Sequence, residues 1–254
     1  MGRRWQHQVS AEWLLARKDV LTATEIKGLI PEMKRIKKKP LKDGEISPAF
    51  AALWSEKRTE SLPETESPSS DAARGHIMEP YAIDSWNSEE PDKKLYHWDD
   101  CIIKANKVGF SPDAMDIEQI SDAVEMKAKD VKPKAIMEIK SYNPAHHIKC
   151  ILKDKLELDE VWQIAVAFYV LPSLETAYLT FFCPDNPVSM HVFEYSREDL
   201  QDKMAVITDV VREYERTELE CEKRFSFPQH YSGFTEEFIF QEYIAENYGT
   251  LIMK

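Results

Sequence analysis

AIMEIKSY, residues 135–142, is a short apolar run with the composition of a β-strand and with two charges inside it. Side chains alternate between the two faces of a strand, so we expect Glu138 and Lys140 on the same face. A carboxylate and an ammonium are costly to bury unless they are paired or bind a metal ion. The segment therefore predicts a buried strand that carries a polar site. The alternative is an exposed edge strand with an ordinary ion pair.

The Glu-x-Lys pattern is weak by itself, because glutamates 25, 32, 125 and 138 each have a lysine two residues on. Only the copy at Glu138 lies inside an apolar run. Upstream, Asp113 sits in a Ser-Pro-Asp turn after the run KVGF, where its carboxylate is expected to meet Glu138 across neighbouring strands. Two carboxylates and a lysine suit a hard divalent cation and phosphate chemistry. The alternative for Asp113 is turn formation alone.

Other apolar runs extend this strand into one sheet. Four of them have strand length and strand composition: CIIKA (101–105), KVGF (107–110), TAYLTFFC (176–183) and SMHVFEY (189–195). Residues 156–171, LELDEVWQIAVAFYVL, are apolar nearly all round and predict a helix buried against the sheet. We therefore predict a single α/β domain spanning residues 1–254.

Helix signals surround the sheet. Residues 11–18 predict a short helix, Thr22 and Glu25 form a capping box for a second helix, and Pro31 should end or kink it. Further helices are expected after Ser47 and Pro48, through 74–87, and from Ser196 and Asp199 to about Glu215. The Ser, Pro and Glu-rich residues 60–71 predict a mobile loop, and a C-terminal extension is expected from about 217.

The chain is acidic, with a formal net charge of −12, which argues against a uniformly basic nucleic-acid-binding surface. Any DNA contact must be local, at Arg3 and Arg4, at 34–42 or at 127–134; the alternative for each cluster is a solvated face. The 4 cysteines include no CxxC pair, so no zinc or iron–sulfur site is expected. No apolar segment has the length of a signal or membrane span, which predicts a soluble, cytoplasmic protein with no membrane partner.

These motifs together carry a resemblance. Asp113 followed by Glu138-x-Lys140 resembles the PD-(D/E)XK nuclease signature. Three more segments are similar to the family of the phage lambda exonuclease and the YqaJ-type viral recombinases. They are RGHIMEP with Glu79, VWQIAVAFYV with Gln163, and EWLLARKDVLTATEI, whose W-x3-R-x4-T-A-[ST]-E spacing matches the family's start. The five segments follow the family's order from Trp13 to about Val170.

The resemblance implies a PD-(D/E)XK core, a central mixed sheet flanked by helices. It implies that Glu79, Asp113, Glu138 and the main-chain carbonyl of Ile139 bind one or two Mg²⁺ or Mn²⁺ ions. Lys140 would orient and help deprotonate the attacking water. A pocket for a terminal 5′-phosphate would be formed by four further residues, Arg17, Thr24, Ser111 and Gln163.

The implied activity is digestion of linear double-stranded DNA from a 5′ end, which leaves a 3′ overhang for a recombinase or annealing partner. The implied assembly is a ring-shaped homotrimer, and the implied setting is a phage or prophage product in the bacterial cytoplasm. Two departures stand out: the segment between Asp113 and Glu138 is longer and lysine-rich, which places an insertion near the active face, and the strand-splitting position holds Ala72. A structure- or site-specific endonuclease on the same core, and a non-catalytic DNA-binding scaffold, remain as alternatives.

Overall fold

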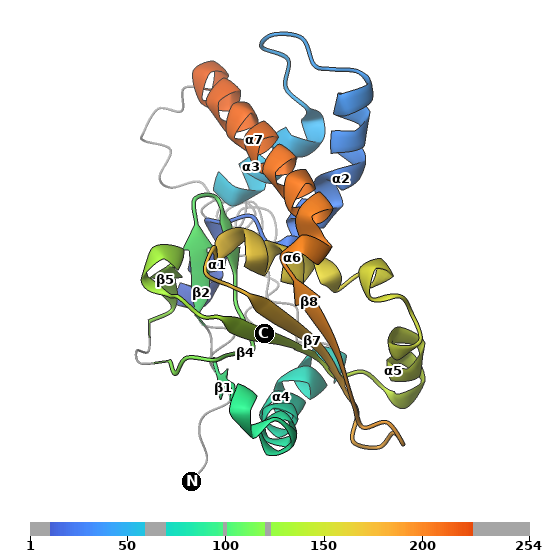
Figure 1. The fold of residues 1–254 in the computed structure, drawn as a ribbon. Helices are drawn as coiled ribbons and strands as arrows, with labels where there is room; N and C mark the ends of the chain where they lie inside the picture. Colours follow the sequence, from blue (N-terminus) through green and yellow to red (C-terminus); the bar gives the residue numbers. More distant parts are fainter. Residues whose placement is uncertain (1–10, 59–69, 99–100, 120–122, 226–254) are drawn as a thin grey trace, which may run out of the picture.

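The computed structural model describes residues 11–58, 70–98, 101–119 and 123–225 of the 254-residue chain. Helices pack around two β-sheets (Figure 1). The helices are α1 (Ala11–Lys18), α2 (Ala23–Lys38), α3 (Pro48–Arg58), α4 (Ser70–Glu89), α5 (Pro144–Ile151), α6 (Val161–Val170) and α7 (Gln201–Arg224). The strands are β1 (Tyr96–His97), β2 (Ile102–Ala105), β3 (Val108–Phe110), β4 (Ala114–Met115), β5 (Glu125–Lys127), β6 (Ala135–Lys140), β7 (Thr176–Phe182) and β8 (Met190–Ser196). Short 3₁₀ turns are η1 (Pro91–Lys93), η2 (Ala128–Asp130), η3 (Lys155–Glu157) and η4 (Glu198–Leu200).

The larger sheet has five strands in the order β1-β4-β6-β7-β8, with β6 at its centre. The pair β6 and β7 is parallel, and the other neighbours are antiparallel. The parallel pair requires a crossover, and α5 and α6 supply it. The predicted α/β class and mixed sheet are therefore confirmed, and 135–142 supplies the central strand.

The expectation of one sheet was wrong for the runs CIIKA and KVGF. These runs form β2 and β3, which belong to a separate three-stranded sheet in the order β3-β2-β5. The parallel partner of β2 is β5, and Asn106, at φ 52°, makes the tight turn from β2 to β3. The neighbour of β6 is instead β4, whose two residues are too few to give a visible alternation in the sequence.

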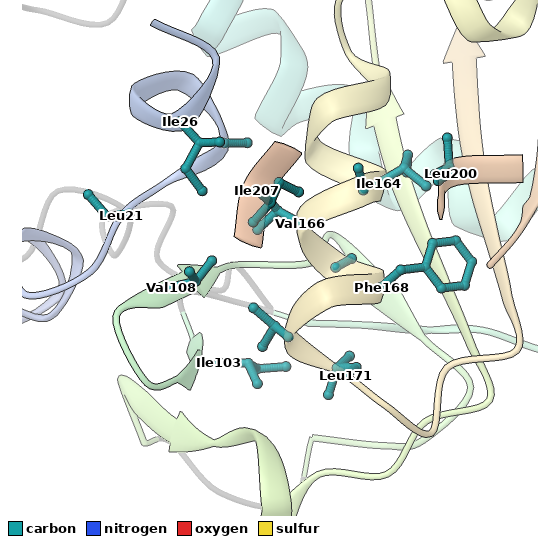
Figure 2. Close-up of a cluster of buried hydrophobic side chains, with 14 of the residues drawn as sticks. Leu21, Ile26, Ile103, Val108, Ile164, Val166, Phe168, Leu171, Leu200 and Ile207 are labelled. Carbon is teal, nitrogen blue, oxygen red and sulfur yellow. The ribbon is translucent and has the colours of Figure 1, made fainter. Parts of the chain in front are cut away.

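Two apolar clusters cover the two faces of the larger sheet. One cluster joins α6 to α2, α3, α7 and the small sheet, and Figure 2 shows Ile164, Val166 and Phe168 of α6 at its centre. The other cluster packs α4 against Met137 and Ile139 of β6. Because strand residues alternate, Glu138 shares the α6 face with Ile136. The predicted buried helix is thus the layer that covers the charged face of β6.

The N-terminal helices attach to the small sheet at one close approach. The capping box is confirmed: the Thr22 amide and hydroxyl donate to Glu25 Oε2 at 2.7 and 2.9 Å. Leu21 bridges to Val108, and a Cβ on Gly109 would lie 2.7 Å from Val20 Cγ2. A glycine at 109 is therefore what allows Val20, two residues after α1, to pack directly on β3.

Several expected boundaries differ from the structure. Pro31 lies inside α2, which continues to Lys38, and α7 continues through the expected extension boundary to Arg224. Most of the 60–71 loop and the segment 226–254 lie outside the described residues. All 4 cysteines are buried and unbridged. Within the described ranges, no helix combines the length and apolar character needed to cross a membrane.

The burial of α6 yields a stability prediction. Phe168 is 0% exposed, so Phe168→Ala should lower the free energy of unfolding by about 3–5 kcal/mol, because it removes a packed ring and leaves a cavity. Urea denaturation would measure the loss. Leu152→Ala is the control: that side chain is 79% exposed, and its removal should cost less than about 0.5 kcal/mol. Equal losses for the two variants would contradict the assigned core.

Candidate active site

A cavity of about 240 Å³ opens between the N-terminal helices, α4, β6 and α6. All nine residues for which a site role was expected line it, although they come from separate segments of the chain. They are Arg17, Thr24, Glu79, Ser111, Asp113, Glu138, Ile139, Lys140 and Gln163. Trp13, His76, Gly109 and Phe110 are among the other lining residues. The sequence-derived set therefore forms one site in space.

Glu138 is the most fully engaged carboxylate of the site. It is 6% exposed, and its Oε1 accepts from Lys140 Nζ at 2.6 Å and from Gln163 Nε2 at 2.7 Å. Strand alternation supplies the first partner, and the first turn of α6 supplies the second. The expected same-face placement of Glu138 and Lys140 is thus found. Gln163 was expected to contact a phosphate. In the structure its amide donates to the Glu138 carboxylate.

Asp113 reaches the same place from the residue before β4. Its Oδ2 accepts from the Ile139 amide at 2.6 Å, and its carbonyl accepts from the Trp98 amide at 3.0 Å. Desolvation, followed by the charges of Glu138 and Glu79, raises the pKa of Asp113 well above its usual range. The carboxylates of this cavity therefore repel one another.

The same negative charges stabilise the charged form of Lys140. Burial alone would lower the pKa of its ammonium, but the charges of Glu138 and Asp113 outweigh that effect and raise the pKa above its ordinary value. Lys140 is therefore held as a cation that donates hydrogen bonds. In this arrangement it serves as a fixed positive charge beside the two carboxylates.

Glu79 lies on α4 between two histidines that the sequence analysis did not include. Its Oε1 is 3.2 Å from His76 Nδ1, and its Oε2 is 3.7 Å from His97 Nε2. Desolvation raises the pKa of Glu79, but the two histidines outweigh it and lower the pKa to about 2. The helical i, i+3 spacing of His76 and Glu79 was a usable sequence signal. No local pattern could have indicated His97, which comes from β1.

The cavity is also lined by an arginine and by hydroxyl residues. Arg17 is exposed and lies over the Trp13 ring, 5.1 Å from its centroid. Thr24, in the first turn of α2, is also exposed, and Ser111 lies two residues before Asp113. Arg17, Thr24 and Ser111 offer a guanidinium and two hydroxyls in the cavity that holds the carboxylates, a set suited to an anionic group.

The donor set suits a hard divalent cation, because it consists of carboxylates and a main-chain carbonyl. Among the described residues, however, no three His, Cys, Asp or Glu side chains are already arranged to hold a metal ion together. Lys140, Gln163, Ile139 and the two histidines occupy the carboxylates instead. A cation would have to displace some of these contacts, and it would relieve the repulsion that raises the pKa of Asp113.

The lysine-rich insertion was expected near the active face, but none of its described residues lines the cavity. Its residues form β5 and η2 instead, and β5 pairs with β2 in the small sheet. Ala72 falls in the first turn of α4, and its side chain lies outside the described residues.

The arrangement of these elements matches solved structures. An alkaline exonuclease, LHK-Exo from Laribacter hongkongensis, superposes with a TM-score of 0.54 at 17% identity, covering 85% of this chain and 96% of that chain. The chain has the fold of an alkaline exonuclease. The crystal structure of LHK-Exo in complex with dAMP gives a TM-score of 0.55 at 15% identity, covering 85% of this chain and 97% of that chain. At the sequence level, no family model and no curated protein matches.

The repulsion around Asp113 in this exonuclease fold can be measured. Because the folded pKa lies above the unfolded value, the ionised carboxylate destabilises the fold at neutral and alkaline pH. The cost disappears below about pH 4, where both states are protonated. With chelator present, Asp113→Asn should therefore raise the free energy of unfolding by about 0.5–2 kcal/mol near pH 8, and the gain should shrink as the pH falls.

Denaturation of both proteins across this pH range is the measurement. Asp130→Asn, at an exposed aspartate, is the matched control and should change little at any pH. A destabilised Asp113→Asn variant at pH 8, or a gain that does not vary with pH, would refute the repulsion.

Proposed function

We propose that this protein is a metal-dependent deoxyribonuclease that digests linear double-stranded DNA from its 5′ ends and leaves 3′ single-stranded overhangs. The observation that carries the proposal is the convergence of Glu79, Asp113, Glu138 and Lys140 on one cavity with a guanidinium and hydroxyls beside them. The fold match to an alkaline exonuclease supports the same chemistry. The dAMP in one LHK-Exo structure is consistent with a mononucleotide product.

In this proposal Glu79, Asp113, Glu138 and the Ile139 carbonyl hold Mg²⁺, or Mn²⁺ in its place. When bound, the cation supplies Lewis-acid polarisation of the phosphate and lowers the pKa of water. Lys140, held protonated by its neighbours, donates to the reacting phosphate or to the incoming water and orients it. The Gln163 amide, which donates to Glu138 in the structure, would be available to a phosphate if that carboxylate held a cation instead.

The wider biology follows the family resemblance. The 3′ overhang would serve a recombinase or single-strand annealing partner in phage-type recombination within a bacterial cell. A closed homotrimer around DNA would let an acidic chain hold a polyanion, because only the channel needs cations. An endonuclease on the same core would differ by cutting a covalently closed circle, and a scaffold would cut no DNA at all.

The first test is cleavage of end-labelled linear duplex and a closed circle with Mg²⁺, with Ca²⁺ and with chelator. Glu138→Ala should reduce the rate on linear duplex at least about 100-fold, because it removes a proposed cation ligand. Glu125→Ala is the control, since Glu125 also begins a Glu-x-Lys pattern on a strand but is exposed. Equal rates for the two variants would sink the site assignment, and cutting of the circle would favour the endonuclease.

The second test concerns the 5′ end. Arg17→Ala should erase most of the rate advantage of 5′-phosphorylated over 5′-hydroxyl duplex, a loss of about 1.5–3 kcal/mol for a charged hydrogen bond. Single-turnover rates on both substrates give the ratio. Arg212→Ala removes an exposed arginine that does not line the cavity and should leave the ratio unchanged. An unchanged ratio in Arg17→Ala would place end recognition elsewhere.

A further inference from the structure

The acidic residue that precedes α6 joins this helix to the segment that follows β6. Glu160 occupies the N-cap position of α6, but its side chain makes no capping hydrogen bond. Its Oε1 instead accepts from the Tyr142 hydroxyl at 2.7 Å, and Tyr142 lies two residues beyond Lys140. Neither Tyr142 nor Glu160 lines the active-site cavity, so the proposed chemistry gives neither of them a role.

A second hydrogen bond joins the same two elements inside the cavity. The Gln163 side chain donates to Glu138 at 2.7 Å, and the Gln163 main-chain amide donates to the Glu160 carbonyl at 2.9 Å. Gln163 and Glu160 therefore belong to the same turn at the start of α6, while Glu138 and Tyr142 belong to one continuous segment. The start of α6 is thus attached to this segment at two places, one inside the cavity and one outside it.

Tyr142 is itself held in a defined position. Its ring stacks on the His146 ring, with the centroids 4.1 Å apart and the planes at 10°, and it also packs against Phe181 of β7. Burial, followed by the hydrogen bond to Glu160, raises the pKa of the Tyr142 hydroxyl above its ordinary value, whereas the smaller effect of Lys140 lowers it. The hydroxyl therefore stays protonated as a donor, and it lies within electrostatic reach of Lys140.

The first turn of a helix needs such contacts, because its amides have no partners within the helix. Another acid at this helix start, Asp159, pairs with Lys27 at 2.8 Å, but the two side chains are 78% and 42% exposed, and exposed ion pairs contribute little. Tyr142 and Glu160 are half-buried, so their hydrogen bond restrains the turn more strongly. A shift of this turn would carry the Gln163 amide away from the carboxylate to which it donates.

We propose that Tyr142 and Glu160 are positioning residues of the nuclease, which fix the first turn of α6 and thereby hold the Gln163 amide at Glu138. This inference rests on the proposed nuclease function and adds two residues that need touch neither DNA nor cation. Their effect passes through Gln163, because Gln163 is the residue of that turn that donates to the buried carboxylate.

The main experiment measures single-turnover cleavage of a 5′-phosphorylated linear duplex in Mg²⁺ and, separately, binding of the same duplex in chelator. Tyr142→Phe removes the hydroxyl and keeps the ring that stacks on His146. It should lower the cleavage rate about threefold to tenfold, the effect of one hydrogen bond, and leave duplex affinity unchanged. Tyr195→Phe is the matched control: it removes an equally short hydrogen bond, 2.7 Å to the Lys155 carbonyl, outside the cavity, and should keep the wild-type rate.

Further variants separate positioning from stability. Glu160→Gln keeps an oxygen that accepts from Tyr142 and should retain most of the wild-type rate, whereas Glu160→Ala should lose as much as Tyr142→Phe. In a Gln163→Ala background Tyr142→Phe should have no additional effect on the rate, because the interaction through which it acts is already absent.

A readout without DNA or cation is amide hydrogen exchange in chelator. Exchange in residues 161–166 should be faster in Tyr142→Phe than in the wild-type protein, because the first turn of α6 loses its restraint. Tyr195→Phe should leave exchange in these residues unchanged. Equal exchange in the two variants overturns the inference.

The cleavage results decide between the two levels of the proposal. If the wild-type protein cleaves DNA and Tyr142→Phe cleaves at the same rate as Tyr195→Phe, the inference is overturned and the proposed function stands. A loss of the same size in the Gln163→Ala background also overturns the inference. A wild-type protein that cleaves no DNA overturns the proposed function and the inference together. Thermal melting detects unfolding, and Glu160→Gln against Glu160→Ala decides the matter if Tyr142→Phe does not fold.

Discussion

The buried contact of Glu138 with Lys140 and Gln163 is the constraint on which the rest of the site depends. A carboxylate that is 6% exposed requires partners, and they can be supplied only if β6 is central and α6 covers its charged face. The apolar surface of α6 fixes that layer (Figure 2). Gln163, in the first turn of α6, then donates to Glu138 of the strand. Packing and polar pairing therefore specify the same arrangement of strand and helix.

The same pairing has a cost for ligand binding. Asp113 and Glu79 also have partners inside the protein, so an incoming cation competes with hydrogen bonds that already exist. The raised pKa of Asp113 and the lowered pKa of Glu79 show that two carboxylates of one cavity can be placed in opposite electrostatic environments. Asp113 is the group with most to gain from a nearby positive charge, whereas the two histidines already lower the pKa of Glu79.

Local patterns predicted the parts of this molecule whose structure is locally determined. The alternation in 135–142 placed Glu138 and Lys140 on one face, the apolar composition of 156–171 predicted α6, and the pair Thr22 and Glu25 predicted the start of α2. The division into two sheets depends on pairing between distant segments, so no local pattern contained it. For the same reason the sequence could not predict His97 beside Glu79, and the grouping of the nine site residues came from the family resemblance.

Gly109 has a consequence for how far apart the two halves of the cavity are. The Val20 side chain packs where a side chain at position 109 would lie, and Leu21 exchanges main-chain hydrogen bonds with Lys107 and Gly109, so the segment after α1 lies close against the strand. Arg17 extends from one side of that contact, and Ser111 and Asp113 follow directly on the other. A larger residue at position 109 would therefore push this segment away from β3 and widen the cavity between the two sides.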